Sequence, residues 1–292
     1  MSGSYTVGTG GDYDSLAKVI DSLQFYGFNG PVTFNILAGT YDEPVEIGSV
    51  YGASPTNTIT FQSADANADS VIWENTANSS GTNYVLKLNG TDHITLKHIT
   101  FKNQGTSYSQ KIVLSGLTES VTIDSSKFLG VQSSSEYHAS IFSLYSDAPG
   151  LKIKNSTFTD AGGYAIYLNS NNSSSPPTGL EISNNTFTDT YSGIYARYYD
   201  ALTIRGNSIV GSYMHNYGIY LEYCDGANVI EDNHINAPDM THGIYLYYCR
   251  ATSGNEATIV NNLINTEDYG IFFDYYNDYQ NIYYNTIKVR DS

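Results

Sequence analysis

A repeat of apolar and polar columns constrains this chain more than any other feature. Eight segments align on an apolar pair whose members lie five residues apart, and the second member recurs every 22 to 30 residues. The pairs are Leu96/Phe101, Ile123/Phe128, Ile153/Phe158, Ile182/Phe187, Ile204/Ile209, Ile230/Ile235, Ile259/Ile264 and Ile282/Ile287. Two residues before the second member runs a polar column, Ser126, Ser156, Asn185, Asn207, Asn233, Asn262 and Asn285. Fixed columns with an irregular period indicate loops of varying length between strands that stay in register.

Each unit carries a second strand with alternating polarity. It reads Gly-Ile-Tyr-Leu-Glu-Tyr at 218–223, Gly-Ile-Tyr-Leu-Tyr-Tyr at 243–248 and Gly-Ile-Phe-Phe-Asp-Tyr at 270–275. Several short strands per turn of roughly 25 residues are typical of a coil of parallel strands. We therefore predict an all-β parallel β-helix, a solenoid of roughly 9–10 coils stacked about 4.8 Å apart. The Asn column should form a ladder of amides inside one turn of every coil.

Residues 1–31 are predicted to form an N-terminal cap. Asp14 or Ser15 can cap a short amphipathic helix in which Leu16, Val19, Ile20 and Leu23 share one face. This helix would cover the edge of the first coil. The solenoid should then occupy residues 32–292, with its first strands at 32–37 and 58–62. No equivalent cap is expected at the other end, and we interpret the chain as part of a longer solenoid.

The net charge of the chain limits the classes of partner that it can bind. The chain has 13 basic and 29 acidic residues, a net charge of −16. Nucleic acid is excluded as a partner because phosphate binding requires a basic stripe. The acidic balance also favours a neutral glycan over a polyanionic one. No apolar run approaches the ~18 residues that span a bilayer, so membrane insertion is not expected.

The N-terminal residues resemble a known superfamily. Gly8-Thr-Gly-Gly-Asp-Tyr13, the helix with Leu16 and Ile20, Gly39-Thr-Tyr-Asp-Glu43 and Val45-Glu-Ile47 are similar to the cap and first coil of pectin lyase-like β-helices. Residues 84–287 resemble the parallel β-helix repeat found there and in large secreted bacterial surface proteins. The resemblance implies a right-handed β-helix that is extracellular or at a cell surface. The first residues have no signal-peptide character, so the expected location comes from the resemblance alone.

Catalytic motifs of the superfamily are missing. The chain has neither the Gly-Arg-Pro-Trp motif of pectinesterases nor the Asp-Asp pair of polygalacturonases. Whether the chain is an enzyme therefore stays open, because a fold does not carry a chemistry with it.

One outward column of the second strand is aromatic throughout. This tyrosine ribbon comprises Phe142, Tyr167, Tyr195, Tyr220, Tyr245 and Phe272. Rings at one-coil spacing would form an exposed strip about 24 Å long, and such rings can pack on pyranose sugars. A neighbouring column adds Glu222 and Tyr247. The alternatives are stacking that only stabilises the ladder and a protein interface.

A second hypothesis places catalysis on the same face. Tyr217, Tyr220, His242 and Arg197 would lie within about two coils of one another. A His base, a Tyr acid and an Arg that neutralises a carboxylate suit β-elimination from a uronate. The simpler interpretation is that Arg197 pairs with Glu222 and that His242 is a surface residue.

Two further columns are interpreted structurally. Asp147, Asn172, Asp200, Asp225, Arg250 and Asn277 suit tight turns; Ca²⁺ binding there is less favoured because one carboxylate per coil is sparse. No cofactor or other metal is expected. Cys224 and Cys249 share a column, and buried thiols are favoured over a disulfide because their parallel Cβ vectors fit a bridge poorly.

The sequence thus favours an extracellular glycan-recognising module within a larger surface or secreted protein. The alternatives are a polysaccharide-degrading enzyme, a lyase more than a hydrolase, and a structural adhesin or stalk. Self-association would use the aromatic face or the uncapped C-terminal edge.

Overall fold

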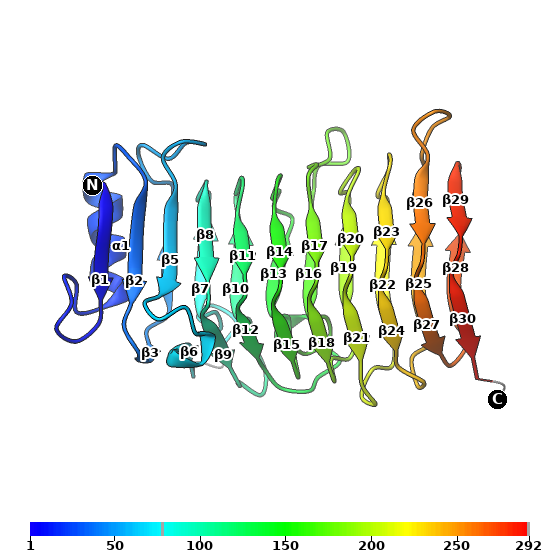
Figure 1. Ribbon diagram of the computed structural model, residues 1–292, viewed down its shortest axis with the longest axis horizontal. Helices are drawn as coiled ribbons and strands as arrows, with labels where there is room; N and C mark the ends of the chain where they lie inside the picture. Colours follow the sequence, from blue (N-terminus) through cyan, green and yellow to red (C-terminus); the bar gives the residue numbers. More distant parts are fainter. Residues whose placement is uncertain (77–78, 291–292) are drawn as a thin grey trace.

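The protein is a solenoid of three parallel sheets in a computed structural model that describes residues 1–76 and 79–290. Figure 1 shows the coils stacked along the long axis, from β1 beside helix α1 at one end to β30 at the other. We name the three sheets A, B and C in the order in which the chain enters them. Each full coil contributes one strand to sheet A, one to sheet B and one to sheet C, and the chain then begins the next coil.

Sheet A has eleven strands: β1 (Gly3–Val7), β2 (Val32–Ile36), β5 (Ile59–Ser63), β8 (Ile94–Lys97), β11 (Thr122–Asp124), β14 (Lys152–Lys154), β17 (Glu181–Ser183), β20 (Thr203–Arg205), β23 (Val229–Glu231), β26 (Ala257–Val260) and β29 (Gln280–Tyr283). Sheet B has ten: β3 (Gly39–Asp42), β6 (Val71–Asn75), β9 (Thr100–Asn103), β12 (Lys127–Leu129), β15 (Thr157–Thr159), β18 (Thr186–Thr188), β21 (Ser208–Val210), β24 (His234–Asn236), β27 (Leu263–Thr266) and β30 (Thr286–Val289). Sheet C has nine: β4 (Val45–Ile47), β7 (Leu86–Asn89), β10 (Ile112–Ser115), β13 (Ile141–Leu144), β16 (Ile166–Asn169), β19 (Ile194–Arg197), β22 (Tyr217–Glu222), β25 (His242–Tyr247) and β28 (Tyr269–Asp274). Two 3-10 turns, η1 (Ala68–Ser70) and η2 (Glu136–His138), complete the elements.

The predicted fold class is confirmed. Nine coils supply a strand to all three sheets, and a partial coil at each end brings sheet A to eleven strands. Strand β1 pairs with β2 in parallel from Gly3↔Val32 to Val7↔Ile36. Residues 3–7, which the prediction included in the cap, therefore form the first strand of sheet A. This strand precedes the repeat, so no aligned column of the sequence identified it as a strand.

Helix α1 (Leu16–Tyr26) follows the sequence prediction closely. The Ser15 side chain accepts a hydrogen bond from the Lys18 backbone N–H, and Leu16, Val19, Ile20 and Leu23 are buried. The helix contacts β4, the edge strand of sheet C. A helix thus covers the sheet edge at which another chain could otherwise pair.

The two apolar columns form the interior. Phe101, Phe128, Phe158 and Phe187 stack from coil to coil with ring centroids 4.6–5.4 Å apart. Every one of these rings is fully buried. Consecutive coils are therefore locked in register by identical inward side chains.

The Asn column forms the predicted ladder. Nδ2 of Asn185, Asn207, Asn233 and Asn262 each donates to Oδ1 of the next Asn along the solenoid at 2.9–3.0 Å. The same Nδ2 atoms also donate to a backbone oxygen of the preceding coil, as Asn233 does to Ile204. Four of the five Asn side chains are buried, and their polar atoms are satisfied by each other and by backbone.

The turn column after sheet C has the structural role expected of it. Asp200 Oδ1 accepts from the Asp225 N–H of the next coil at 2.9 Å, and Asp225 Oδ1 accepts from the Arg250 N–H at 2.8 Å. These side chains tie neighbouring turns together.

Candidate binding face on sheet C

The tyrosine ribbon lies on the outer side of sheet C. Tyr167 pairs in register with Phe142 and Tyr195, and the register continues through Tyr220 and Tyr245 to Phe272. Ile166 and Leu168, on either side of Tyr167, belong to the core, whereas none of the ribbon rings does. Strand alternation therefore points these rings away from the interior.

The ribbon is less exposed than the sequence predicted. Phe142 and Tyr195 have only 7% and 6% of their surface exposed, and the remaining rings are half-buried. Coil spacing causes this shielding, because Phe142, Tyr167 and Tyr195 stack with centroids 4.8–5.4 Å apart and interplanar angles of 15–25°. Stacked rings cover each other's faces and present mainly their edges and hydroxyls to solvent.

Tyr220 breaks the stack. Its ring is turned 67° from Tyr195 and 89° from Tyr245. Beyond it, Tyr245 and Phe272 stack again at 11°. Tyr220 therefore presents a different part of its ring to a ligand than the stacked rings on either side of it do.

Carboxylates hold the ribbon hydroxyls. Tyr195 Oη donates to Glu222 Oε2 at 2.6 Å, and Tyr245 Oη donates to Asp274 Oδ2 at 2.7 Å. Burial, followed by these carboxylates, raises the pKa of both phenols above the ordinary tyrosine value. The phenols stay protonated and remain hydrogen-bond donors at neutral pH.

Glycines at the start of the ribbon strands β22 and β25, and directly before β19, allow neighbouring coils to approach closely. A Cβ atom on Gly193, Gly218 or Gly243 would lie 2.4–2.6 Å from the backbone oxygen of the next glycine in the column. Even alanine would clash there, which explains the Gly of the Gly-Ile-Tyr motif.

The proposed catalytic residues divide into two groups. Tyr217, Tyr220 and His242 are close, with the Tyr217 ring centroid 4.7 Å from Tyr220 and 5.2 Å from His242. Arg197 pairs in register with Glu222, whereas His242 pairs with Tyr217. Five residues of strand separate those two positions, about 16 Å along the sheet.

Each group has its own partners. Arg197 Nε lies 3.5 Å from Glu222 Oε1, and the guanidinium lies 4.8 Å from the Tyr198 ring centroid. His242 stacks on Tyr269, and its buried Nδ1 has no hydrogen-bond partner among the described residues. Burial lowers the pKa of His242, opposed by Asp268, which favours the neutral ring at pH 7.

The structure adds an aromatic column that the sequence analysis missed. This corner stack consists of Tyr198, Tyr223, Tyr248 and Tyr275, with successive centroids 5.1–5.2 Å apart and interplanar angles of 12–19°. All four have φ between 51° and 56°, a left-handed conformation, and they directly follow β19, β22, β25 and β28 of sheet C. Tyr247 stands across this stack at 68–86°. The signal was present, since each member lies three residues after a ribbon ring.

The two cysteines are free and buried. Cys224 Sγ donates to the Ala196 oxygen at 3.3 Å and Cys249 Sγ to the Leu221 oxygen at 3.5 Å. The preference for reduced thiols over a disulfide is therefore confirmed.

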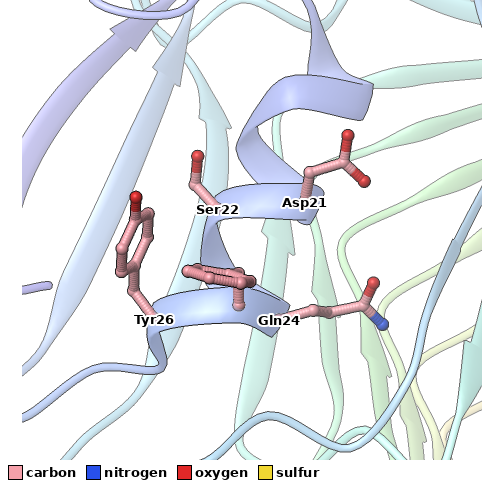
Figure 2. Close-up of a pocket in the computed structure, with 5 residues that line it drawn as sticks. Asp21, Ser22, Gln24 and Tyr26 are labelled. Atoms are coloured by element: carbon pink, nitrogen blue, oxygen red, sulfur yellow. The ribbon is translucent and has the colours of Figure 1, made fainter.

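A hollow far along the chain from this face lies on helix α1. Its volume is about 640 Å³, and its lining comes from one helix, with Asp21, Ser22, Gln24 and Tyr26 labelled in Figure 2. Phe25, which also lines it, is 80% exposed. One helix supplies no opposing wall, so this hollow is an open surface and not an enclosed site.

No group of three or more His, Cys, Asp and Glu side chains suited to a metal ion occurs among residues 1–76 and 79–290. Over the same residues, no helix is long and apolar enough to cross a membrane.

Comparison with solved structures supports the fold. The pectin methylesterase of Aspergillus niger in deglycosylated form is 13% identical with a TM-score of 0.53, over 98% of this chain and 86% of that one. Its penultimately deglycosylated form gives 14% identity, the same TM-score and the same coverage. Carrot pectin methylesterase gives 13% identity and a TM-score of 0.47, over 98% and 88%. Identities this low concern the fold alone.

Sequence comparison gives the family. The chain matches none of the curated proteins with which it was compared. Residues 93–291 match the family described as periplasmic copper-binding protein (NosD). This segment contains the ribbon, the corner stack and the Asn ladder, and the chain belongs to that family of parallel β-helix proteins.

Proposed function

We propose that this protein is a glycan-recognising β-helix module that acts outside the cytoplasm, in the periplasm or at the cell surface. The observation that carries the proposal is the aromatic surface of sheet C, where the tyrosine ribbon and the corner stack run side by side over successive coils. Aromatic rings with hydrogen-bonding rims suit the apolar faces and hydroxyls of sugars. The periplasmic family description and the pectin-related fold neighbours are compatible with this location.

The charge of the face favours a neutral glycan. Glu222 and Asp274 lie among the rings, and residues 155–292 carry fifteen acidic against five basic groups. A uronate polymer would meet repulsion over most of this surface. Hydroxyls of a neutral sugar can instead donate to the carboxylate oxygens. They can also donate to the hydroxyl oxygens of Tyr195 and Tyr245, whose own protons are already donated to Glu222 and Asp274.

Copper does not enter the proposal, although the family description names it. Cu(I) prefers soft thiolate and thioether ligands, but the thiols of Cys224 and Cys249 are buried and already donate to backbone oxygens. The described residues bring no third His, Cys, Asp or Glu to them. The two thiols and the described residues around them therefore do not fit a copper site.

Affinity electrophoresis tests the proposal. Gels containing neutral glucans, xylans or mannans should retard the protein, and a gel with polygalacturonate should retard it less. Tyr220→Ala combined with Tyr247→Ala, which removes the two rings turned across their stacks, should abolish retardation. Tyr51→Ala is the matched control, because this tyrosine is 87% exposed but lies outside sheet C.

A polysaccharide lyase is the second candidate, favoured by the contact between Tyr217 and the half-buried His242. Under that hypothesis polygalacturonate or another uronate polymer yields unsaturated product, and His242→Ala removes the product while binding persists. Absorbance at 235 nm follows the product. A stalk would instead show no retardation by any glycan and a change of oligomeric state on mutation of the aromatic face.

A further inference from the structure

A separate pocket opens at the end of the tyrosine ribbon. It has a volume of about 200 Å³ and uses Phe142, the first ring of the ribbon, as one wall. Tyr108 and Tyr137 supply the other aromatic walls, and Asn83 and Gln110 supply amides. The lining comes from three successive coils: from the segments that lead into β7 and β10, and from η2 and β13.

The aromatic walls differ from the stacked ribbon. Tyr108 and Tyr137 are 5.5 Å apart at 59°, and Tyr137 and Phe142 are 6.4 Å apart at 41°. Tyr137 is 44% exposed. Tilted rings around a hollow enclose a ligand from several sides, which parallel rings at van der Waals distance cannot do.

The amides leave one acceptor and one donor for a ligand. Asn83 and Gln110 are 3% and 5% exposed, and Asn83 Nδ2 donates to Gln110 Oε1 at 3.1 Å. Within the part of the chain that the structure describes, Asn83 Oδ1 and Gln110 Nε2 have no hydrogen-bond partner. Neither atom is among the described side-chain atoms that are both buried and unpartnered, so both are accessible to a ligand or to water.

Buried polar contacts hold the pocket in shape. Asn103 Nδ2 donates to the backbone oxygens of Asn83 at 2.7 Å and Gln110 at 3.4 Å. The Ser109 backbone N–H donates to the backbone oxygen of Tyr137 at 3.1 Å. This bond joins the segment that contains Tyr108 and Gln110 to the segment that contains Tyr137. A preorganised pocket loses little freedom when it binds a ligand.

The chemistry of the lining identifies the ligand class. Ser80 and Leu144 complete the lining, so every side chain in it is uncharged. Aromatic walls pack on C–H faces, and one free acceptor beside one free donor matches a pair of sugar hydroxyls. We propose that this pocket binds one neutral pyranose residue of the glycan that continues along the tyrosine ribbon, a subsite that rests on the proposed function.

Two pocket variants test the subsite. Tyr137→Ala removes an exposed wall. Gln110→Glu keeps the oxygen that Asn83 uses but replaces the free donor with an acceptor. In gels of the neutral glycan that retards wild type, each variant should bind at least about tenfold more weakly. The methyl glycoside of the preferred sugar should compete for wild type more strongly than for either variant.

The outcomes separate the two proposals. If Tyr137→Ala and Gln110→Glu bind like wild type while Tyr220→Ala/Tyr247→Ala does not, the subsite is overturned and glycan recognition stands. Failure of every glycan to retard wild type overturns both. Loss of binding in the pocket variants alone supports a pyranose site in the pocket but overturns the continuation of the glycan along the ribbon. Circular dichroism checks the fold, and if Gln110→Glu does not fold, Tyr137→Ala decides.

Discussion

Lys111 Nζ donates to the backbone oxygen of His138 across 3.3 Å, inside the protein. The lysine side chain is fully buried, and His138 Nδ1 in turn lies 3.0 Å from Ser109 Oγ. Burial lowers the pKa of Lys111 from 10.5 to about 7, although the charge of Asp160 opposes the shift. The amine therefore loses its proton in the native protein at a pH where the unfolded chain keeps it.

Lys111→Met should stabilise the protein at neutral pH. Between about pH 7 and 10.5 the unfolded state binds one proton more than the native state, so wild-type stability rises with pH by about 1.4 kcal/mol per pH unit. Methionine removes this proton linkage and keeps a similar volume, so the variant should gain roughly 3–5 kcal/mol at pH 7. Its advantage should shrink towards pH 9.

Urea unfolding at pH 6, 7, 8 and 9 measures the effect. Lys127→Met is the control, because Lys127 is partly exposed and pairs with Asp69 at the surface. Parallel stability curves for wild type and Lys111→Met over this range would show that the buried amine stays charged.

Asn233→Ala should weaken the ladder at its centre. The substitution leaves the backbone N–H of Asn207 and one Nδ2–H of Asn207 without their acceptor. Two unsatisfied buried donors cost about 2–5 kcal/mol. Thermal unfolding measures the loss. Asn236→Ala, which removes an exposed hydrogen bond to Asn265 one strand away, should cost less than about 1 kcal/mol.

The ribbon tyrosines should ionise only when the protein unfolds. Burial raises the pKa of Tyr167, Tyr195, Tyr220 and Tyr245, whereas tyrosine in an unfolded chain titrates near pH 10. Their contribution to stability is complete below about pH 10 and is lost as the pH rises beyond it. Absorbance at 295 nm should gain a phase that coincides with loss of the circular dichroism signal. Full ionisation before any such loss would contradict the prediction.

Neither cysteine should react in the native state. Burial raises the pKa of Cys224, and both Sγ atoms donate to backbone oxygens, whereas thiol reagents attack the thiolate. Ellman's reagent should detect almost no thiol in native protein and two thiols per chain in guanidinium. Rapid labelling of native protein, or fewer than two thiols after unfolding, would be inconsistent with these contacts.

The repeat made the fold predictable because each column constrains many coils at once. A single Ile or Asn says little, but seven Ile residues in register specify the inward face and five Asn residues in register specify the ladder. Strand β1 escaped prediction because it precedes the repeat and has no matching columns. Its partner β2 was predicted, at 32–37, as the first strand of the solenoid.

The candidate site was predictable only in part. The alternation of residues along each strand predicted that the ribbon rings lie on the outer side of the sheet. The 67° angle between the Tyr220 and Tyr195 rings depends on side-chain packing, which residue spacing does not reveal. Tyr108 and Tyr137 lie in loops of unequal length, so no column aligned them. Lys111 could not be predicted for another reason. A lysine before a strand is expected at the surface, but here the segment containing His138 covers it.

The Asn ladder has a direction. Each side-chain amide from Asn185 to Asn262 donates one N–H to the Oδ1 of the later rung and accepts at its own Oδ1 from the earlier coil. Its second N–H donates to a backbone oxygen of the earlier coil. The bonds between side chains therefore all run in one direction along the solenoid. Aligned hydrogen bonds polarise one another and strengthen cooperatively. The bonds at Asn207 and Asn233, with ladder neighbours on both sides, should therefore be stronger than those at the first and last rungs. The ladder should therefore hold neighbouring coils together most firmly at the rungs of Asn207 and Asn233, which are both buried.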